Sequence, residues 1–184
     1  KTRTVTFNEF SIGGDTHNTV FIAGPCAVES MEQMETVAKC LKENDIHILR
    51  AGCFKPRTSP YSFQGLGEEG VEILKEIRKK YNLSIITEIR DATHAKTVIE
   101  AADIVQIGAK AMYDHGVLAA CGDTAKHVLV KRGFGSTLKE FVQAAEFILS
   151  RGNPNVILCE RGIRTFETNT RFTLDLCGVS WIKE

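Results

Sequence analysis

The sequence predicts an α/β fold of the TIM (β/α)8 barrel type, and three observations carry this prediction. Six short apolar runs alternate with helical patterns along the chain. The runs are continuously apolar, as expected for parallel strands that are buried on both faces. Each run ends in polar residues, and in a parallel α/β barrel the carboxyl ends of the strands share the face that holds the active site. We expect the chain to supply about six βα units and an N-terminal β-hairpin.

Length and composition narrow the classes of protein. The chain has 184 residues, with 23 basic and 23 acidic side chains. This balance favours neither nucleic acid nor a membrane surface as a partner. The length suits a single partial barrel domain over 1–184, in which 1–17 form a hairpin that caps the barrel. The six cysteines are widely spaced without a C-x-x-C pair, which indicates reduced thiols and a cytoplasmic location.

Periodicity and capping signals define the elements in chain order. Short alternating segments around turn residues predict the hairpin, over 4–7 and 10–12. Strands are expected over 19–26, 46–50, 84–88, 103–108, 127–131 and 155–160. Helices are expected over 30–44, 67–80, 91–101 and 114–120, from 137 onward, and from about 165. Ser30 with Gln33, and Thr137 with Glu140, have the spacing of capping boxes, which mark two of the helix starts.

The loop after the second expected strand is rich in cations. Arg50, Lys55 and Arg57 lie within eight residues, and Pro56 and Pro60 restrict the backbone between and after them. Arginine offers a planar fork for carboxylate or phosphate, and lysine offers a compact point charge. A stiff loop with both residue types is suited to binding a small phosphorylated acid, whereas a merely solvated basic loop is the alternative.

The other strand ends carry the same kind of chemistry. The polar residues at the six strand ends are Cys26; Arg50 with Lys55; Glu88; Gln106 with Lys110; Lys131 with Arg132; and Glu160 with Arg161. If the cations at these ends, together with Arg57 and Arg164, converge on one rim, only Glu88 and Glu160 are there to neutralise them. The pattern therefore predicts a ligand with several negative charges.

Cys26 is the candidate reactive residue at the first strand end. A thiol in a field of cations should have a lowered pKa, so Cys26 could act as a nucleophile or as a metal ligand. The five histidines show no H-x-x-x-H spacing. A complete metal site therefore cannot be assembled from the sequence by inspection.

Several motifs together resemble a known family. They are Ala-Gly-Pro-Cys-Ala-Val-Glu at 23–29, Lys-Pro-Arg-Thr-Ser-Pro-Tyr-Ser-Phe-Gln-Gly at 55–65, Gln-Ile-Gly-Ala at 106–109, Lys-Arg-Gly-Phe at 131–134 and Leu-Cys-Glu-Arg-Gly-Ile-Arg-Thr-Phe at 158–166. In order and spacing they resemble 3-deoxy-D-arabino-heptulosonate 7-phosphate (DAHP) synthase of type Iβ. This family condenses phosphoenolpyruvate with erythrose 4-phosphate in the first step of the shikimate pathway, which leads to the aromatic amino acids.

The resemblance implies roles for individual residues. The residues that would hold the phosphate and carboxylate of phosphoenolpyruvate are Arg50, Lys55, Lys131 and Arg161. The residues that would receive the phosphate of erythrose 4-phosphate are Arg57, Thr58 and Ser59. Gln106 and Glu160 are further candidates for substrate binding. Lys110 stands where the family usually has arginine, and the loss of the bidentate fork predicts weaker substrate binding. Lys55 would also transfer a proton at the acceptor aldehyde.

A divalent metal ion (Mn, Fe, Zn or Co) is also implied by the resemblance, with Cys26 as one ligand and the aldehyde oxygen as the group it polarises. The remaining ligands, a His, a Glu and an Asp, are expected beyond Glu184. The family's barrel has eight strands, and the pattern supplies six of them. Two explanations stand. An incomplete part of a longer protein is favoured over a short chain whose barrel is completed by a partner or left open, because an open barrel would expose two sheet edges.

Two other functions stay open. One is a KDO 8-phosphate-type synthase that uses arabinose 5-phosphate, although the motif at 55–65 favours erythrose 4-phosphate. The other is a truncated, non-catalytic paralogue that binds anions or regulates a full-length partner. From the resemblance we expect a homo-oligomer, either a dimer or a tetramer.

Overall fold

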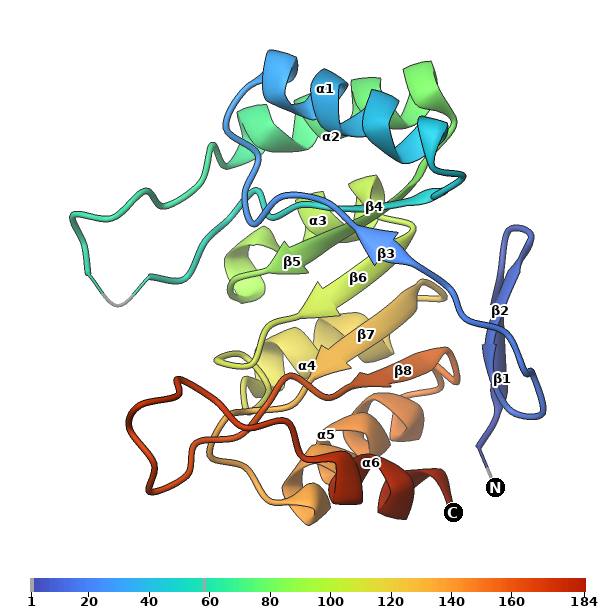
Figure 1. The fold of residues 1–184 in the computed structure, drawn as a ribbon, viewed down its shortest axis with the longest axis vertical. Helices are drawn as coiled ribbons and strands as arrows, with labels where there is room; N and C mark the ends of the chain where they lie inside the picture. Colours follow the sequence, from blue (N-terminus) through green and yellow to red (C-terminus); the bar gives the residue numbers. More distant parts are fainter. Residues whose placement is uncertain (1, 58) are drawn as a thin grey trace. The chain divides into compact units, whose positions relative to one another are not determined.

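The computed structural model describes residues 2–57 and 59–184 of the chain. Contacts within it divide the chain into two compact units. The first unit comprises Phe21–Gln106, and the second joins Lys1–Val20 with Ile107–Glu184. Both units are built from strands that alternate with helices, and the second also carries the N-terminal hairpin (Figure 1).

The first unit is a sheet with accompanying helices. Its strands, in sheet order, are β3 (Ile22–Ala23), β4 (Ile48–Arg50), β5 (Ser84–Ile89) and β6 (Ile104–Ile107). Its helices are α1 (Met31–Glu43), α2 (Glu68–Tyr81), the short 3-10 helix η1 (Ala92–His94) and α3 (Ala95–Ala101). β4 pairs in parallel with both β3 and β5, and Ile48 lies opposite Ile22 and Ser84. Chain order therefore follows sheet order, as successive βα units require.

The core of the first unit lies along its central strands. Every residue of β5 and β6 is buried, which agrees with the continuous apolar pattern of these strands. Asp103, just before β6, accepts a hydrogen bond of 2.8 Å from the backbone N–H of Ile85 and pairs with Arg78 of α2. One carboxylate thus ties a strand start to the helix beside it. β3 is shorter than the strand expected over 19–26, and Pro25, two residues after its end, lacks the N–H that would continue the ladder.

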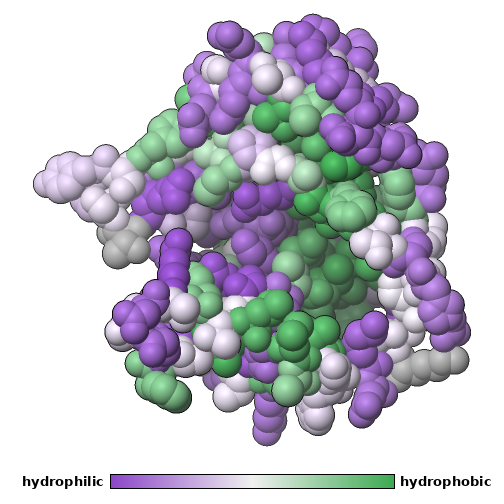
Figure 2. Space-filling view, in the orientation of Figure 1, coloured by the Kyte–Doolittle hydropathy of each residue, from purple (hydrophilic) through white to green (hydrophobic). Residues whose placement is uncertain are grey.

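α1 and α2 lie side by side in the first unit (Figure 1). Their outward faces are charged and form the hydrophilic surface at the top of Figure 2. The expected start of α1 is confirmed, since Ser30 Oγ accepts a hydrogen bond from the N–H of Gln33 at 3.1 Å. The Gln33 side chain accepts its own bond from the N–H of Glu29 rather than from Ser30. Among the residues described, none of the helices combines the length and apolar character needed to span a bilayer.

The second unit pairs two strands and carries the hairpin. The elements of the second unit are β1 (Thr4–Phe7), β2 (Phe10–Gly13), α4 (His115–Gly122), β7 (His127–Lys131), α5 (Leu138–Ser150), β8 (Val156–Cys159) and α6 (Leu176–Lys183). β7 and β8 are parallel, with Lys131 opposite Cys159, and β1 and β2 form the expected antiparallel hairpin. His127 Nε2 lies 2.9 Å from the carbonyl oxygen of Thr6, so a hydrogen bond joins the hairpin to β7.

The final helix begins later than the sequence pattern predicts. A helical segment was expected from about Thr165, but α6 begins at Leu176. The intervening chain folds back on itself instead, because Ile163 and Thr173 exchange two backbone hydrogen bonds of 2.8 and 2.9 Å in an antiparallel bridge. Asp175 then caps α6 by accepting a hydrogen bond from the N–H of Gly178. The expectation of helix at 165 was therefore wrong.

The helix α5 begins with the expected capping box. Thr137 and Glu140 form both reciprocal hydrogen bonds of the box. Phe141 and Ile148 are buried, whereas Val142 and Leu149 are 38% and 42% exposed. Those two residues lie at the edge of the apolar stripe, where a helix of 3.6 residues per turn carries them away from the core.

The Thr137 cap gives a test of local stability. Thr137→Ala removes the side-chain oxygen that accepts from the N–H of Glu140, and should lower the free energy of unfolding by about 1 kcal/mol. Urea denaturation measures the loss. Thr170→Ala, in an exposed loop, is the matched control and should leave the midpoint unchanged. Equal midpoints for both variants would contradict the cap.

Candidate active site

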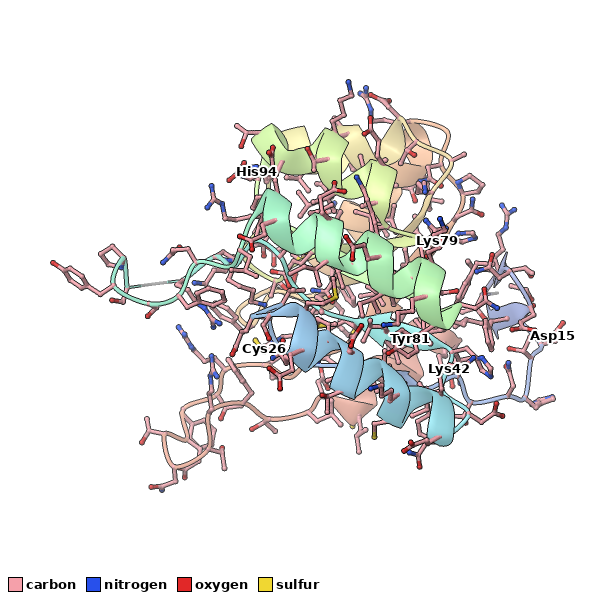
Figure 3. The ribbon with its side chains drawn as sticks, turned by 90° about the horizontal axis from the view of Figure 1, so that it is seen from above. Asp15, Cys26, Lys42, Lys79, Tyr81 and His94 are labelled. Carbon is pink, nitrogen blue, oxygen red and sulfur yellow. The ribbon has the colours of Figure 1, made fainter. Side chains whose placement is uncertain are left out.

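A polar cluster gathers at the carboxyl ends of the strands in the first unit. Parallel register places Arg50 at the end of β4 opposite Ile86 of β5, and Gln106 lies near the end of β6. Figure 3 shows Cys26 and His94 at the end of the unit where α1 and α2 begin. Lys42, Lys79 and Tyr81 lie at the opposite ends of these two helices (Figure 3). The expected gathering of functional side chains at one end of the strands is thus observed within this unit.

Arg50 is held by three neighbouring groups. Its Nη2 lies 3.5 Å from Glu88 Oε2, and its Nε donates to Gln106 Oε1 at 3.3 Å. Gln106 in turn donates from Nε2 to the same Glu88 oxygen. Glu88 and Gln106 are buried, at 7% and 4% exposure. The guanidinium is therefore oriented by side chains that are themselves fixed in the core, which is how a binding group becomes preorganised.

Lys55 is a buried cation at the same end. It is 5% exposed, and its Nζ donates to the carbonyl oxygen of Cys26 at 2.9 Å. Gly52 makes room for it, because a Cβ at position 52 would lie 2.9 Å from both Cδ and Nζ of Lys55. Arg50 Nη1 also reaches the Cys26 carbonyl, at 3.4 Å. Arg50 and Lys55 thus share the carbonyl oxygen of Cys26. Among the described residues, Glu88 is the one carboxylate within ion-pair distance of either cation.

The thiol of Cys26 responds to these cations. Burial by itself would raise the pKa of Cys26, but the charge of Lys55, the hydrogen bond from Arg57 and the charge of Arg50 outweigh it. The pKa of this thiol therefore lies below its ordinary value. Arg57 Nη2 lies 3.9 Å from the Cys26 sulfur. Cys26 is also exposed, so the thiolate is accessible.

Two buried cysteines show the opposite behaviour. Burial raises the pKa of Cys53 to about 11 and that of Cys121 to about 12. In the described part of the chain, no cation acts on Cys121. Lys55 is the one cation there that lowers the pKa of Cys53, and its effect is smaller than that of burial. The lowered pKa of Cys26 was predicted from its place among cations at a strand end, and the electrostatics of the cluster agree with that prediction.

The rest of the loop after β4 is exposed. Arg57 Nε donates to the carbonyl oxygen of Phe63 at 3.3 Å, and Ser59 Oγ accepts from the N–H of Tyr61 at 3.3 Å. Gln64 Nε2 donates to the carbonyl oxygen of Ser59, which closes the loop on itself. Thr58, a further predicted substrate contact, lies outside the described residues. The loop therefore presents Arg57 and Ser59 on an internally hydrogen-bonded turn.

A second polar cluster lies in the second unit, after β7 and β8. Arg132 is 4% exposed and follows Lys131, which ends β7. Its Nη1 donates to Glu160 Oε2 at 2.7 Å and to Asp175 Oδ2 at 2.8 Å. Its Nε and Nη2 donate to the carbonyl oxygen of Ser136. Arg132 therefore joins the end of β7, the residue after β8 and the cap of α6.

Glu160 and Arg161 follow β8 directly. Glu160 Oε1 accepts from the N–H groups of Arg161 at 2.8 Å and Gly162 at 2.6 Å, so both of its oxygens are occupied. The guanidinium of Arg161 lies over the ring of Phe172, with Cζ 3.9 Å from the centroid. Burial lowers the pKa of Arg161, and the charge of Arg171 lowers it further. Arg161 is thus a cation without a carboxylate beside its guanidinium in the described part of the chain.

The structure adds residues that the sequence did not point to. Asp175 accepts a hydrogen bond from Arg132, and Phe172 lies beneath Arg161. Both Asp175 and Phe172 come from a segment that was expected to be helical. No short motif links Asp175 to Arg132, since the two are 43 positions apart. Lys110, by contrast, lies exposed in the turn after β6, as its position in the sequence indicates.

Cys26 is the candidate metal ligand of the polar cluster in the first unit, as an exposed thiol with a lowered pKa. Searching residues 2–57 and 59–184 reveals no group of three or more His, Cys, Asp or Glu side chains that could hold a metal ion.

Comparison with known proteins now identifies the class of this chain. The chain matches two solved synthase structures over all or nearly all of its own length. One is the crystal structure of the DAHP synthase of Thermotoga maritima, with a TM-score of 0.91, 46% identity, and coverage of 100% of this chain and 53% of that chain. A truncated form of the same synthase gives a TM-score of 0.88, 41% identity, and coverage of 98% and 65%. The predicted barrel fold with about six βα units and a hairpin is confirmed.

The sequence profile of the DAHP synthetase I family matches residues 3–184, and the chain belongs to this family. It is 49% identical over 163 residues to the phospho-2-dehydro-3-deoxyheptonate aldolase of Thermotoga maritima. The aligned region covers 89% of this chain and 48% of that protein. It is 37% identical over 150 residues to the 2-dehydro-3-deoxyphosphooctonate aldolase of Fusobacterium nucleatum, covering 78% and 54%. The chain thus spans about half the length of these curated relatives.

The lowered pKa of Cys26 can be tested by alkylation. The rate of its reaction with iodoacetamide, read by peptide mass spectrometry, should reach half its maximum at a lower pH in the folded chain than in urea. Lys55→Met should move the folded midpoint to higher pH, because it removes the cation with the largest effect on the thiolate. Lys42→Met, at the far end of α1, should not move it. Identical midpoints for the two variants would refute the electrostatic account.

The Arg132 junction can be tested by stability. Arg132→Met leaves two carboxylates without their shared partner and should lower the free energy of unfolding by about 3 kcal/mol. Arg151→Met, which breaks an exposed pair with Asp123, is the matched control and should cost far less. Urea denaturation measures both. A similar loss in the two variants would show that the junction is no stronger than a surface pair.

Proposed function

We propose that this chain carries the phosphoenolpyruvate and erythrose 4-phosphate contacts of a DAHP synthase. The observation that carries the proposal is the buried Lys55 amine, which lies with Arg50 against the Cys26 carbonyl and has no carboxylate partner in the described part of the chain. Such a cation is stabilised by an anionic ligand. Membership of the DAHP synthetase I family supports phosphoenolpyruvate as that ligand.

The individual substrate contacts are proposed from the family resemblance. For the phosphate and carboxylate of phosphoenolpyruvate we propose Arg50, Lys55, Lys131 and Arg161. For the phosphate of erythrose 4-phosphate we propose Arg57, Thr58 and Ser59. Further substrate contacts are proposed for Gln106, Lys110 and Glu160. Glu160 already accepts from two backbone N–H groups and Arg132, so its role is to orient the segment that holds Arg161.

Lys55 is proposed as the residue that transfers a proton at the acceptor aldehyde. Carbon–carbon bond formation at the aldehyde carbon turns its oxygen into an alcohol, which needs one proton. A buried ammonium fixed by a backbone carbonyl is a suitable donor because its position does not depend on solvent. Addition of water to the condensed intermediate then releases inorganic phosphate and gives DAHP.

The family's metal requirement is proposed to involve Cys26. A thiolate ligand suits a transition-metal ion, which agrees with Mn, Fe, Zn or Co as the metal. A bound metal would polarise the aldehyde oxygen as a Lewis acid. The further ligands, a His, a Glu and an Asp, are proposed from family resemblance alone.

Two other functions keep a specific observation in their favour. The 37% identity to a 2-dehydro-3-deoxyphosphooctonate aldolase favours a synthase that accepts arabinose 5-phosphate. The cations Arg50, Lys55 and Arg57 around Cys26 would equally suit an anion-binding chain without catalysis. The higher identity of 49% to the heptonate aldolase supports erythrose 4-phosphate over the first of these.

The oligomeric state and the cellular location of the chain are also proposed. A homo-oligomer, a dimer or a tetramer, is proposed from family resemblance. A cytoplasmic location is proposed from the wide spacing of the six cysteines and the lack of a C-x-x-C pair in the sequence. Neither nucleic acid nor a membrane is proposed as a partner, given the balanced charge of the chain.

The proposed reaction is tested by an assay with a divalent metal ion, phosphoenolpyruvate and either aldose phosphate. Turnover with erythrose 4-phosphate should exceed turnover with arabinose 5-phosphate, and Lys55→Met should lower it by a factor of about 100 or more. Lys42→Met should keep full activity. Preference for arabinose 5-phosphate would favour the octonate reaction. Binding of phosphoenolpyruvate without turnover would favour the anion-binding function.

A further inference from the structure

Three arginines and two phenylalanines stack against one another in the second unit. The arginine–phenylalanine stack consists of Phe134, Arg161, Arg164, Arg171 and Phe172. Arg161 Cζ lies 3.9 Å from the Phe172 centroid and 5.8 Å from that of Phe134. Arg164 Cζ lies 4.6 Å from the Phe134 centroid, and the two rings are 5.9 Å apart. Guanidinium groups at these distances are attracted by the electron-rich ring faces.

The backbone of the segment between β8 and α6 builds this stack (Figure 1). The two hydrogen bonds between Ile163 and Thr173 bring Phe172 back beside Arg161. The N–H of Arg164 donates to the carbonyl oxygen of Phe134 at 2.7 Å, which ties the segment to the chain after β7. Gly162 has φ +91°, and a Cβ there would lie 3.0 Å from Phe172 Cβ. The close approach of Phe172 thus depends on backbone contacts and on a glycine.

Hydrogen bonds do not orient the Arg161 guanidinium. Its Nε and Nη1 are buried and have no hydrogen-bond partner among the described residues. Glu160, the carboxylate whose charge acts on Arg161, is occupied by Arg132 and by two backbone N–H groups. The ring faces of Phe172 and Phe134 are therefore the groups that restrain the plane of this guanidinium.

We propose that Phe172, assisted by Phe134, is a positioning residue that holds the Arg161 guanidinium ready for the phosphate of phosphoenolpyruvate. The inference rests on the proposed function, and deepens it by adding a residue that does not touch substrate. An aromatic face restrains the guanidinium without neutralising it, so the positive charge stays available to an anion. A preorganised group loses less conformational freedom on binding, which strengthens affinity.

A purely structural role for Phe172 is the competing explanation, and two variants separate the roles. Phe172→Leu keeps apolar bulk but removes the ring face. Phe172→Tyr keeps the ring face and serves as the matched control. If Phe172 only fills space, leucine should be tolerated at least as well as tyrosine. If its ring positions Arg161, tyrosine should be tolerated and leucine should not.

The experiment combines calorimetric titration with phosphoenolpyruvate and NMR of the arginine Nε–Hε groups. In the wild-type chain the Hε signal of Arg161 should be shifted upfield by the ring beneath it. Phe172→Leu should abolish that shift and raise the Kd for phosphoenolpyruvate about three- to tenfold. Phe172→Tyr should keep both within twofold of wild type. In turnover assays the leucine variant should raise KM for phosphoenolpyruvate and leave kcat unchanged, as loss of uniform binding predicts.

The experiment distinguishes failure of the positioning role of Phe172 from failure of the proposed function. If the wild type binds phosphoenolpyruvate and Phe172→Leu binds it equally well, the positioning role is refuted. Equal weakening in both variants would also refute it, because packing would then be the cause. If the wild type does not bind phosphoenolpyruvate, the proposed function fails. The Hε signal then decides the positioning role alone: an unshifted signal in the wild type refutes it, and a shift that only the leucine variant loses supports it.

Discussion

Parallel pairing of short apolar strands is the constraint on which both units depend. In the first unit the register of β4 on β3 and β5 brings Arg50 to the same end of the sheet as Cys26. In the second unit the register of β7 on β8 sets Lys131 opposite Cys159, one residue before Glu160. Because strands of a parallel sheet run the same way, polar residues that follow them gather at one end without any further signal. The chemistry of each cluster is thus a consequence of strand direction.

The two clusters accommodate positive charge by different means. In the first unit, backbone carbonyls receive the donors of Lys55 and Arg50, and Glu88 is the one carboxylate within reach of Arg50 in the described part of the chain. In the second unit, Arg132 has two carboxylates, whereas Arg161 has aromatic rings. Carbonyl oxygens and ring faces stabilise a cation without cancelling its charge. Both clusters therefore keep positive charge available for an anionic ligand.

Cys26 illustrates how location, more than residue type, sets reactivity. Cys53 and Cys121 are buried, and their thiols stay protonated because burial disfavours the thiolate. Cys26 lies where three cations meet, and their combined effect exceeds that of burial. The same side chain is thus an inert core residue in two places and a candidate ligand in a third.

The sequence by itself determined the alternation of strands and helices, the hairpin, the capping of α5 by Thr137, and the candidates Cys26, Arg50 and Lys55 at strand ends. These features follow from local periodicity, capping chemistry and strand direction, all of which are readable over a few residues. Only the tertiary structure decided that 165–175 folds back instead of forming a helix, that Asp175 pairs with Arg132, and that Phe172 stacks on Arg161. Those contacts join residues far apart in the chain, and their energies exceed the weak local preference for helix that the sequence pattern detects.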